Sequence, residues 1–175
     1  MILERRDLAE RRGARILGEI SGYGFSSDGG HLSLPSGDGL ARAMRMALSD
    51  ACTAPGEIDY ICAHATSTPL GDAVEAQNIH AVFGPSTPPV SSLKSMTGHE
   101  LWMSGASQVV YSVIMAEQGF IAPNANFVRP DKDTENLHIV KEAMPRPPKK
   151  VLCNSAGFGG TNACLVLRFT EDIHP

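Results

Sequence analysis

Segments typical of buried β-strands alternate along this chain with segments of helical periodicity, and this alternation is the strongest constraint on its fold. Leu40, Met44 and Ala47 show the helical spacing, while short apolar runs bounded by turn residues mark the strands. Strands are expected at residues 14–23, 58–63, 90–93, 137–140, 150–154 and 163–169, and helices at residues 1–12, 38–52, 71–83 and 104–118. The pattern predicts an α/β layered fold with a largely parallel sheet.

The last two expected strands follow one another without a helix between them. They are therefore expected to pair antiparallel, which makes the sheet mixed. Residues 24–37, rich in Gly and Ser, are expected to form a loop, and residues 121–136 a connector that contains prolines. No repeat or linker interrupts the chain, so residues 1–175 are interpreted as one domain.

Composition and charge narrow the function classes. The net charge of −4 gives no electrostatic basis for binding nucleic acid. No apolar run is long enough to span a bilayer, and the charged start does not resemble a secretory signal. The four cysteines lack the spacing of a zinc site, and the histidines lack an H-x-x-x-H pair, so we expect no metal and a reduced, cytoplasmic protein.

A first polar loop, residues 64–69 (HATSTP), follows the apolar strand at residues 58–63. It places His64 just past the carboxyl end of a strand, where α/β folds bind their ligands, with the hydroxyls of Thr66 and Thr68 beside it. A structural alternative is that Ser67 or Thr68 caps the following helix, with Pro69 in the first turn. The two interpretations are compatible.

A second polar loop, residues 94–99 (KSMTGH), has the same position after the strand at residues 90–93. Lys94 is interpreted either as a solvated surface lysine or as a half-buried cation paired with Asp72 or Glu75. His99 ends the loop, as His64 begins the first one. Two loop histidines and a lysine predict a site for proton handling and for the stabilisation of negative charge.

A third loop, residues 154–162 (NSAGFGGTN), lies between two expected strands. It lacks the G-x-G-x-x-G spacing and no helix follows it, so a phosphate site is not favoured. A tight turn explains the glycines without a function. Phe158, flanked by glycines, is instead typical of a mobile apolar gate whose backbone N–H groups face a substrate.

Taken together, the three loops resemble those of the β-ketoacyl-acyl carrier protein synthases I and II, decarboxylating condensing enzymes of the thiolase-like fold. Residues 64–75 match the family motif H-x-T-S-T-P followed by G-D-x-x-E. Residues 94–99 match K-S-x-T-G-H, and residues 154–163 match N-S-x-G-F-G-G-T-N-A, in the same order along the chain. Residues 12–16 (RGARI) and 119–123 (GFIAP) match as well, the latter favouring type I. The resemblance implies one thiolase-like layered half-fold, with a mixed sheet of roughly five strands flanked by helices.

The resemblance also implies roles for individual residues. In the family, two histidines bind the malonyl thioester carbonyl and assist decarboxylation, a lysine and acidic residues orient them, a gate phenylalanine lines the oxyanion hole, and two threonines contact the phosphopantetheine arm. The resemblance assigns the histidine roles to His64 and His99, and the orienting roles to Lys94, Asp72 and Glu75. It assigns the gate and the oxyanion hole to Phe158 and Gly159. The contact with the phosphopantetheine arm is assigned to Thr66 and Thr68. The implied partners are an acyl carrier protein and either a second copy or an amino-terminal synthase half, and no cofactor is implied beyond the carrier's phosphopantetheine.

Several departures from the family pattern bear on activity. Family members are about twice this length and carry their nucleophilic cysteine in an amino-terminal half, whose motif none of the four cysteines matches. Cys62 and Gln108 replace an Asn and a Glu that help to bind a cation in type I synthases, and Trp102 replaces a small residue. We therefore expect the carboxyl-terminal half of a synthase, with no complete cycle by this chain alone. A non-catalytic partner and an acyl-thioester-binding module stay open as alternatives.

Two structural expectations follow from this interpretation. Half of a duplicated fold is expected to leave an apolar face exposed. His64, Lys94, His99 and Phe158 are expected to converge on one pocket.

Overall fold

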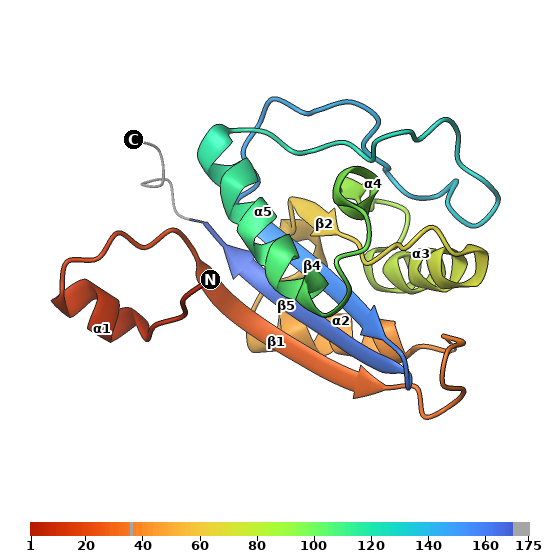
Figure 1. Ribbon diagram of the computed structural model, residues 1–175, viewed down its shortest axis with the longest axis horizontal. Helices are drawn as coiled ribbons and strands as arrows, with labels where there is room; N and C mark the ends of the chain where they lie inside the picture. Colours follow the sequence, from red (N-terminus) through yellow and green to blue (C-terminus); the bar gives the residue numbers. More distant parts are fainter. Residues whose placement is uncertain (36, 170–175) are drawn as a thin grey trace.

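The computed structural model describes residues 1–35 and 37–169 and contains a five-stranded mixed sheet (Figure 1). The strand order is β1 (Glu19–Ser27), β5 (Thr161–Arg168), β4 (Lys150–Gly157), β2 (Tyr60–Cys62) and β3 (Val90–Ser91). β5 runs antiparallel to both β1 and β4, whereas β2 runs parallel to both β4 and β3. The expected mixed α/β sheet with a terminal antiparallel pair is confirmed. The carboxyl ends of β4, β2 and β3 therefore meet at one edge.

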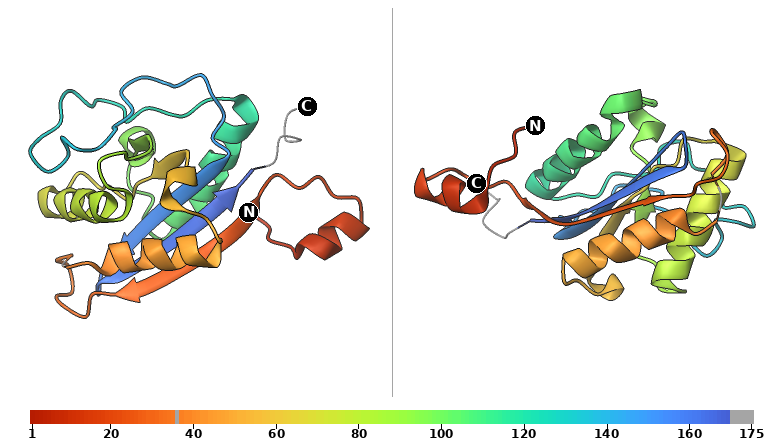
Figure 2. Two further views of the ribbon diagram at one scale, coloured as in Figure 1. Left: turned by 180° about the vertical axis from the view of Figure 1, so that it is seen from behind. Right: turned by 90° about the horizontal axis from the view of Figure 1, so that it is seen from below.

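Helices cover both faces of this sheet. α2 (Gly39–Asp50) and α3 (Pro69–Phe83) lie on one face, and α5 (Ser104–Gln118) lies on the other (Figure 2). Side chains of β2 alternate between the two layers, because successive residues of a strand point to opposite faces. Ile61 belongs to the core under α2 and α3, whereas Tyr60 and Cys62 belong to the core under α5.

The close packing of α2 on β1 depends on two glycines. A Cβ atom at Gly24 would lie 1.9 Å from the carbonyl oxygen of Ala43, and one at Gly22 would lie 2.2 Å from that of Ala47. Tyr23 and Phe25 alternate with these glycines and stay 52% and 47% exposed. Because the glycines face α2, these aromatic rings lie on the face of the sheet that carries α5.

Several expected boundaries were wrong. β1 begins at Glu19 rather than at residue 14 and continues to Ser27, through residues expected to be a loop, because it pairs with β5 along that strand's whole length. β4 likewise extends to Gly157, three residues beyond the expected end. The strand expected at residues 137–140 is reduced to an isolated bridge between Val90 and Ile139.

The short helices also differ from expectation. The helix expected at residues 1–12 is confined to α1 (Arg6–Arg11). α4 (Lys94–Thr97) was not expected, nor were the 3-10 helices η1 (Pro55–Glu57) and η2 (Leu101–Met103). Within the part of the chain that the structure describes, no helix is long and apolar enough to cross a membrane.

Apolar side chains remain exposed on the face of the sheet that carries α5. Val110 and Ile114, one helical turn apart on α5, are 39% and 43% exposed, and Trp102 in η2 is fully exposed. Tyr23 and Phe25 of β1 are exposed on the same face of the sheet. We call these five residues the open apolar face.

Candidate active site

The predicted site residues follow the three parallel strands at their shared carboxyl edge. His64 comes two residues after β2, Lys94 opens α4 three residues after β3, and Phe158 follows β4. This edge is where α/β sheets place their ligands.

A carboxylate from α3 holds the loop that carries His64. Glu75 Oε1 accepts hydrogen bonds from the backbone N–H of His64 at 2.9 Å and from the Asn154 side chain at 3.0 Å, and Oε2 accepts from the backbone N–H of Ala65 at 2.7 Å. Glu75 is only 5% exposed, and burial raises its pKa, an effect that these N–H donors oppose. These hydrogen bonds to Glu75 join α3, the first loop and β4.

The side chain of Lys94 meets the same loop from the other side. Its Nζ donates to the backbone carbonyl of His64 at 2.6 Å. Burial lowers the pKa of Lys94, while the nearby Cys62, Glu75, Glu100 and Asp72 act in the opposite direction. Lys94 makes no ion pair within 4.0 Å to Glu75 or Asp72, all three being described residues. The predicted lysine–carboxylate network is therefore indirect and runs through the backbone of His64.

The two histidine rings lie side by side. Their centroids are 5.8 Å apart and their planes make an angle of 86°. His99 Nδ1 accepts a hydrogen bond from the backbone N–H of Leu101 at 3.1 Å and lies 3.2 Å from the Ser104 hydroxyl. Because a backbone N–H can only donate, neutral His99 carries its proton on Nε2, which makes that atom a donor.

His64 is kept uncharged by its surroundings. Burial, followed by the positive charge of Lys94 and by His99, lowers the pKa of His64 from 6.5 to about 4. Its buried Nδ1 has no hydrogen-bond partner in the structure. A buried polar atom without a partner is costly, which points to a ligand as its partner. At neutral pH the pair is thus equipped to bind an oxygen that develops negative charge.

Thr66 and Thr68 lie on the same loop with their hydroxyl oxygens 3.1 Å apart. Thr68 occupies the N-cap position of α3, but its side chain makes no capping hydrogen bond. Capping by Thr68, one of the two structural alternatives for this loop, is therefore wrong. Burial raises the pKa of the nearby Asp72, whose Oδ1 lacks a hydrogen-bond partner.

The glycine-rich loop is less closely joined to the site than expected. Phe158 is 81% exposed, so its ring is not packed against the histidines. The backbone N–H of Gly159 donates to the carbonyl of Leu32 at 2.6 Å and is not free to bind an oxyanion in this conformation. The structure thus brings His64, His99 and Lys94 together, whereas Phe158 lies in an exposed turn.

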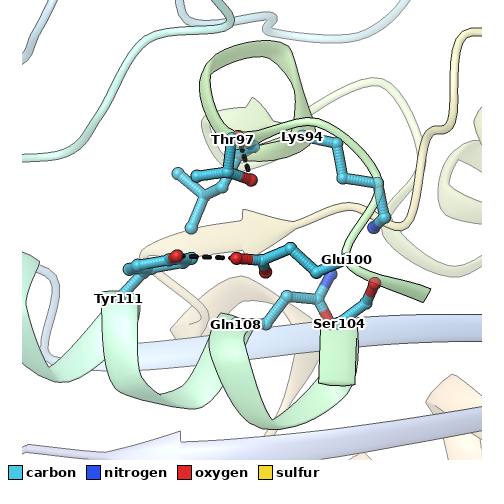
Figure 3. Close-up of a pocket in the computed structure, with 7 residues that line it drawn as sticks. Lys94, Thr97, Glu100, Ser104, Gln108 and Tyr111 are labelled. Atoms are coloured by element: carbon cyan, nitrogen blue, oxygen red, sulfur yellow. Dashed lines mark hydrogen bonds between the residues drawn. The ribbon is translucent and has the colours of Figure 1, made fainter. Parts of the chain in front are cut away.

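A small cavity beside Lys94 is lined by residues that the sequence reasoning missed (Figure 3). Glu100, Ser104 and Tyr111 line it together with Gln108, and the Tyr111 hydroxyl donates to Glu100 Oε1 at 2.8 Å. A signal was present, because positions 104, 108 and 111 share one face of a helix. The remaining lining residues are Leu93 and Thr97.

Cys153 and Cys164 do not have the surroundings of a reactive thiolate. Cys62, Cys153 and Cys164 are buried, and burial raises the pKa of Cys164 while contact with Cys62 and burial raise that of Cys153. Cys52 is exposed but lies beyond the end of α2, away from the carboxyl edge of β2. Among residues 1–35 and 37–169, no group of three potential ligands could hold a metal ion.

The geometry agrees with a comparison against known proteins. The sequence profile of the β-ketoacyl synthase C-terminal domain matches residues 17–128. This chain belongs to the β-ketoacyl synthase family. The 3-oxoacyl-[acyl-carrier-protein] synthase 1 of Escherichia coli is 45% identical over 172 residues, which cover 98% of this chain and 42% of the relative. The synthase domain described here thus spans less than half the length of that curated relative.

Solved ketosynthase structures share the thiolase-like fold. The ishigamide ketosynthase/chain length factor superposes with a TM-score of 0.91 at 38% identity, covering 95% of this chain and 41% of that one. A type II polyketide ketosynthase, solved with its acyl-carrier protein, superposes with a TM-score of 0.89 at 34% identity, covering 95% and 42%. The family and the fold expected from the sequence are both confirmed.

Proposed function

We propose that this chain supplies the decarboxylating half of a β-ketoacyl-acyl carrier protein synthase site, in fatty acid or polyketide chain elongation. The observation that carries the proposal is the contact between the ring of His99 and that of His64, which is uncharged at neutral pH, beside the ammonium group of Lys94. Membership of the β-ketoacyl synthase family supports the substrate class that we propose, a malonyl thioester on an acyl carrier protein.

The chemistry follows from charge. When the malonyl carboxylate leaves as carbon dioxide, the electrons of the broken C–C bond move toward the thioester carbonyl oxygen and form an enolate. The Nε2–H of His99 and an N–H of His64 donate hydrogen bonds to that oxygen, which favours the transition state over the ground state. Lys94 anchors the carbonyl of His64, so the ring keeps its position as charge develops.

Condensation needs a second component. The enolate carbon must attack an acyl group held as a thioester, and the buried cysteines described above are not suited to hold one. We propose that an amino-terminal synthase half supplies the nucleophile and packs on the open apolar face. Thr66 and Thr68 would then contact the phosphopantetheine arm of the carrier, with Phe158 as the gate.

A decarboxylation assay tests the proposal. Malonyl-acyl carrier protein is incubated with this chain, with and without an added amino-terminal half from a relative, and the release of carbon dioxide is measured. We expect His64→Ala and His99→Ala each to lower the rate at least about 100-fold. His138→Ala is the matched control, because His138 is exposed and lies outside the site. Activity that is insensitive to both site substitutions would remove the proposed mechanism.

A non-catalytic pairing partner is the second candidate. It is supported by the Gly159 N–H, which is occupied by Leu32, and by the exposed Trp102, which stands three residues after His99. The same assay separates the two candidates. A partner of this kind would bind the second half without releasing carbon dioxide.

A further inference from the structure

A small cavity beside Lys94 is lined by two side chains of opposite charge, and no ion pair within 4.0 Å joins these two described residues. Lys94 and Glu100 both line it, together with the neutral side chains of Ser104, Gln108 and Tyr111 (Figure 3). An ammonium group offers three N–H donors, one of which goes to the His64 carbonyl. A partly buried cation also needs compensating negative charge, because burial disfavours its charged form.

The other carboxylates that act on Lys94, Glu75 and Asp72, do not line this cavity. Glu75 uses both oxygens on the N–H groups of His64 and Ala65 and on the Asn154 amide. Asp72 lies in the first turn of α3, and it does not line the cavity. The remaining group that raises the pKa of Lys94 is the buried Cys62, whose effect is larger than that of any of these carboxylates.

Glu100 is held in place by a phenol. The hydroxyl of Tyr111, from the middle of α5, donates to Glu100 Oε1 at 2.8 Å, and this contact raises the pKa of Tyr111, so the phenol stays a donor. Gln108 is fixed as well, because its side-chain N–H donates to the carbonyl of Ala63 at 3.1 Å. Its amide carries no charge, so Glu100 is the anionic side chain among the residues that line the cavity.

We propose that Glu100, held by Tyr111, is a positioning residue of this site: it is the counter-ion that keeps Lys94 charged and directed at the His64 carbonyl. The inference rests on the proposed function only for its catalytic consequence. The electrostatic relation between Glu100 and Lys94 stands without any substrate. Glu100 directly follows His99 in the sequence, so it belongs to the same turn of the chain as the second histidine.

Nitrogen NMR of the lysine side chains tests the inference directly. The Nζ resonance of Lys94 is assigned from its loss in Lys94→Arg and followed over pH. In Glu100→Gln we expect the neutral fraction of Lys94 at a given pH to rise about tenfold, a fall of about one in its pKa. Tyr111→Phe should lower the pKa of Lys94 less, because the carboxylate remains but is no longer held.

A rescue variant separates charge from packing. In the double variant Glu100→Gln/Gln108→Glu, a carboxylate returns to the same cavity from α5, and the pKa of Lys94 should return toward its original value. Glu142→Gln is the control, because it removes an exposed carboxylate outside the cavity. The inference would be overturned by a folded Glu100→Gln protein in which Lys94 keeps its original pKa. It would also be overturned if Glu142→Gln lowered the pKa of Lys94 as much as Glu100→Gln does.

The catalytic consequence has its own readout. In the decarboxylation assay, Glu100→Gln should lower kcat more than it raises KM, and the double variant should recover part of the loss. If the chain releases no carbon dioxide, the proposed function fails while the NMR result still decides the role of Glu100. If decarboxylation depends on His64 but the pKa of Lys94 is unchanged in Glu100→Gln, only this inference fails.

Discussion

The ring of His64 meets the ring of His99 edge to face, with the two centroids 5.8 Å apart. The two residues stand on separate loops, one after β2 and the other after α4. Different hydrogen bonds hold the two residues: Glu75 accepts from the backbone N–H of His64, and the backbone N–H of Leu101 donates to the ring of His99. Their contact places two imidazole rings where both can donate a hydrogen bond to one oxygen.

The depressed pKa of His64 predicts an acid-dependent loss of stability. The unfolded chain binds a proton at this residue near pH 6.5, whereas the folded chain does so only near about pH 4. Between these values the unfolded state holds more protons, so the free energy of unfolding falls as the pH falls through this window. The full effect is on the order of 3 kcal/mol. Proton NMR of the histidine rings should show His64 titrating near the lower value.

A substitution isolates this contribution from that of the carboxylates. His64→Asn should remove the acid-dependent fall between pH 6.5 and about 4, measured as the difference in urea unfolding between variant and parent. His138→Asn, at an exposed position, should show the same pH dependence of the free energy of unfolding as the parent. A His64 resonance that titrates at 6.5 in the folded protein would contradict the prediction.

Glu75 should be essential to the folded loop. Glu75→Gln keeps the size of the side chain but turns one oxygen into an N–H donor that faces other donors. We expect the free energy of unfolding to fall by about 2–4 kcal/mol, since buried N–H groups lose a charged acceptor. Hydrogen exchange of the His64 and Ala65 amides should accelerate. For the exposed control Glu142→Gln, the change should stay within about 0.5 kcal/mol.

Gly24 should not tolerate a methyl group. In Gly24→Ala the new Cβ would lie 1.9 Å from the carbonyl oxygen of Ala43, so α2 must move away from β1. We expect a loss of about 3 kcal/mol in thermal or urea unfolding. Gly56→Ala is the matched control, because its added Cβ would meet no atom within 4 Å. Equal stability of the two variants would refute this packing.

Trp102 should report on the open apolar face. It is the one tryptophan in the sequence and is fully exposed, so its fluorescence should resemble that of tryptophan in water. Adding an amino-terminal synthase half should shift the emission to shorter wavelength as the ring is buried. Trp102→Ala should abolish the signal and Ile114→Ser should weaken the binding. An emission spectrum that stays unchanged although the halves co-purify would exclude Trp102 from the contact.

The long amphipathic elements could be predicted from the sequence, but the short ones could not. α5 begins and ends where expected, since fifteen residues carry several turns of periodicity. α4 has four residues, too few for any periodic signal, and it was missed. The expected end of β1 failed for another reason. Gly24 was interpreted as the first residue of a loop, but together with Gly22 it allows α2 to approach the strand.

The sequence by itself determined the family, the α/β layering and the order in which His64, Lys94 and His99 follow their strands, because these depend on local patterns and motif spacing. Only the tertiary structure decided which partner each group has: His64 carbonyl for Lys94, two backbone amides for Glu75, and Tyr111 for Glu100. Such partners are set by burial and by contacts between distant segments. The protonation state of each site residue depends on those contacts and therefore could not be predicted from the residue type.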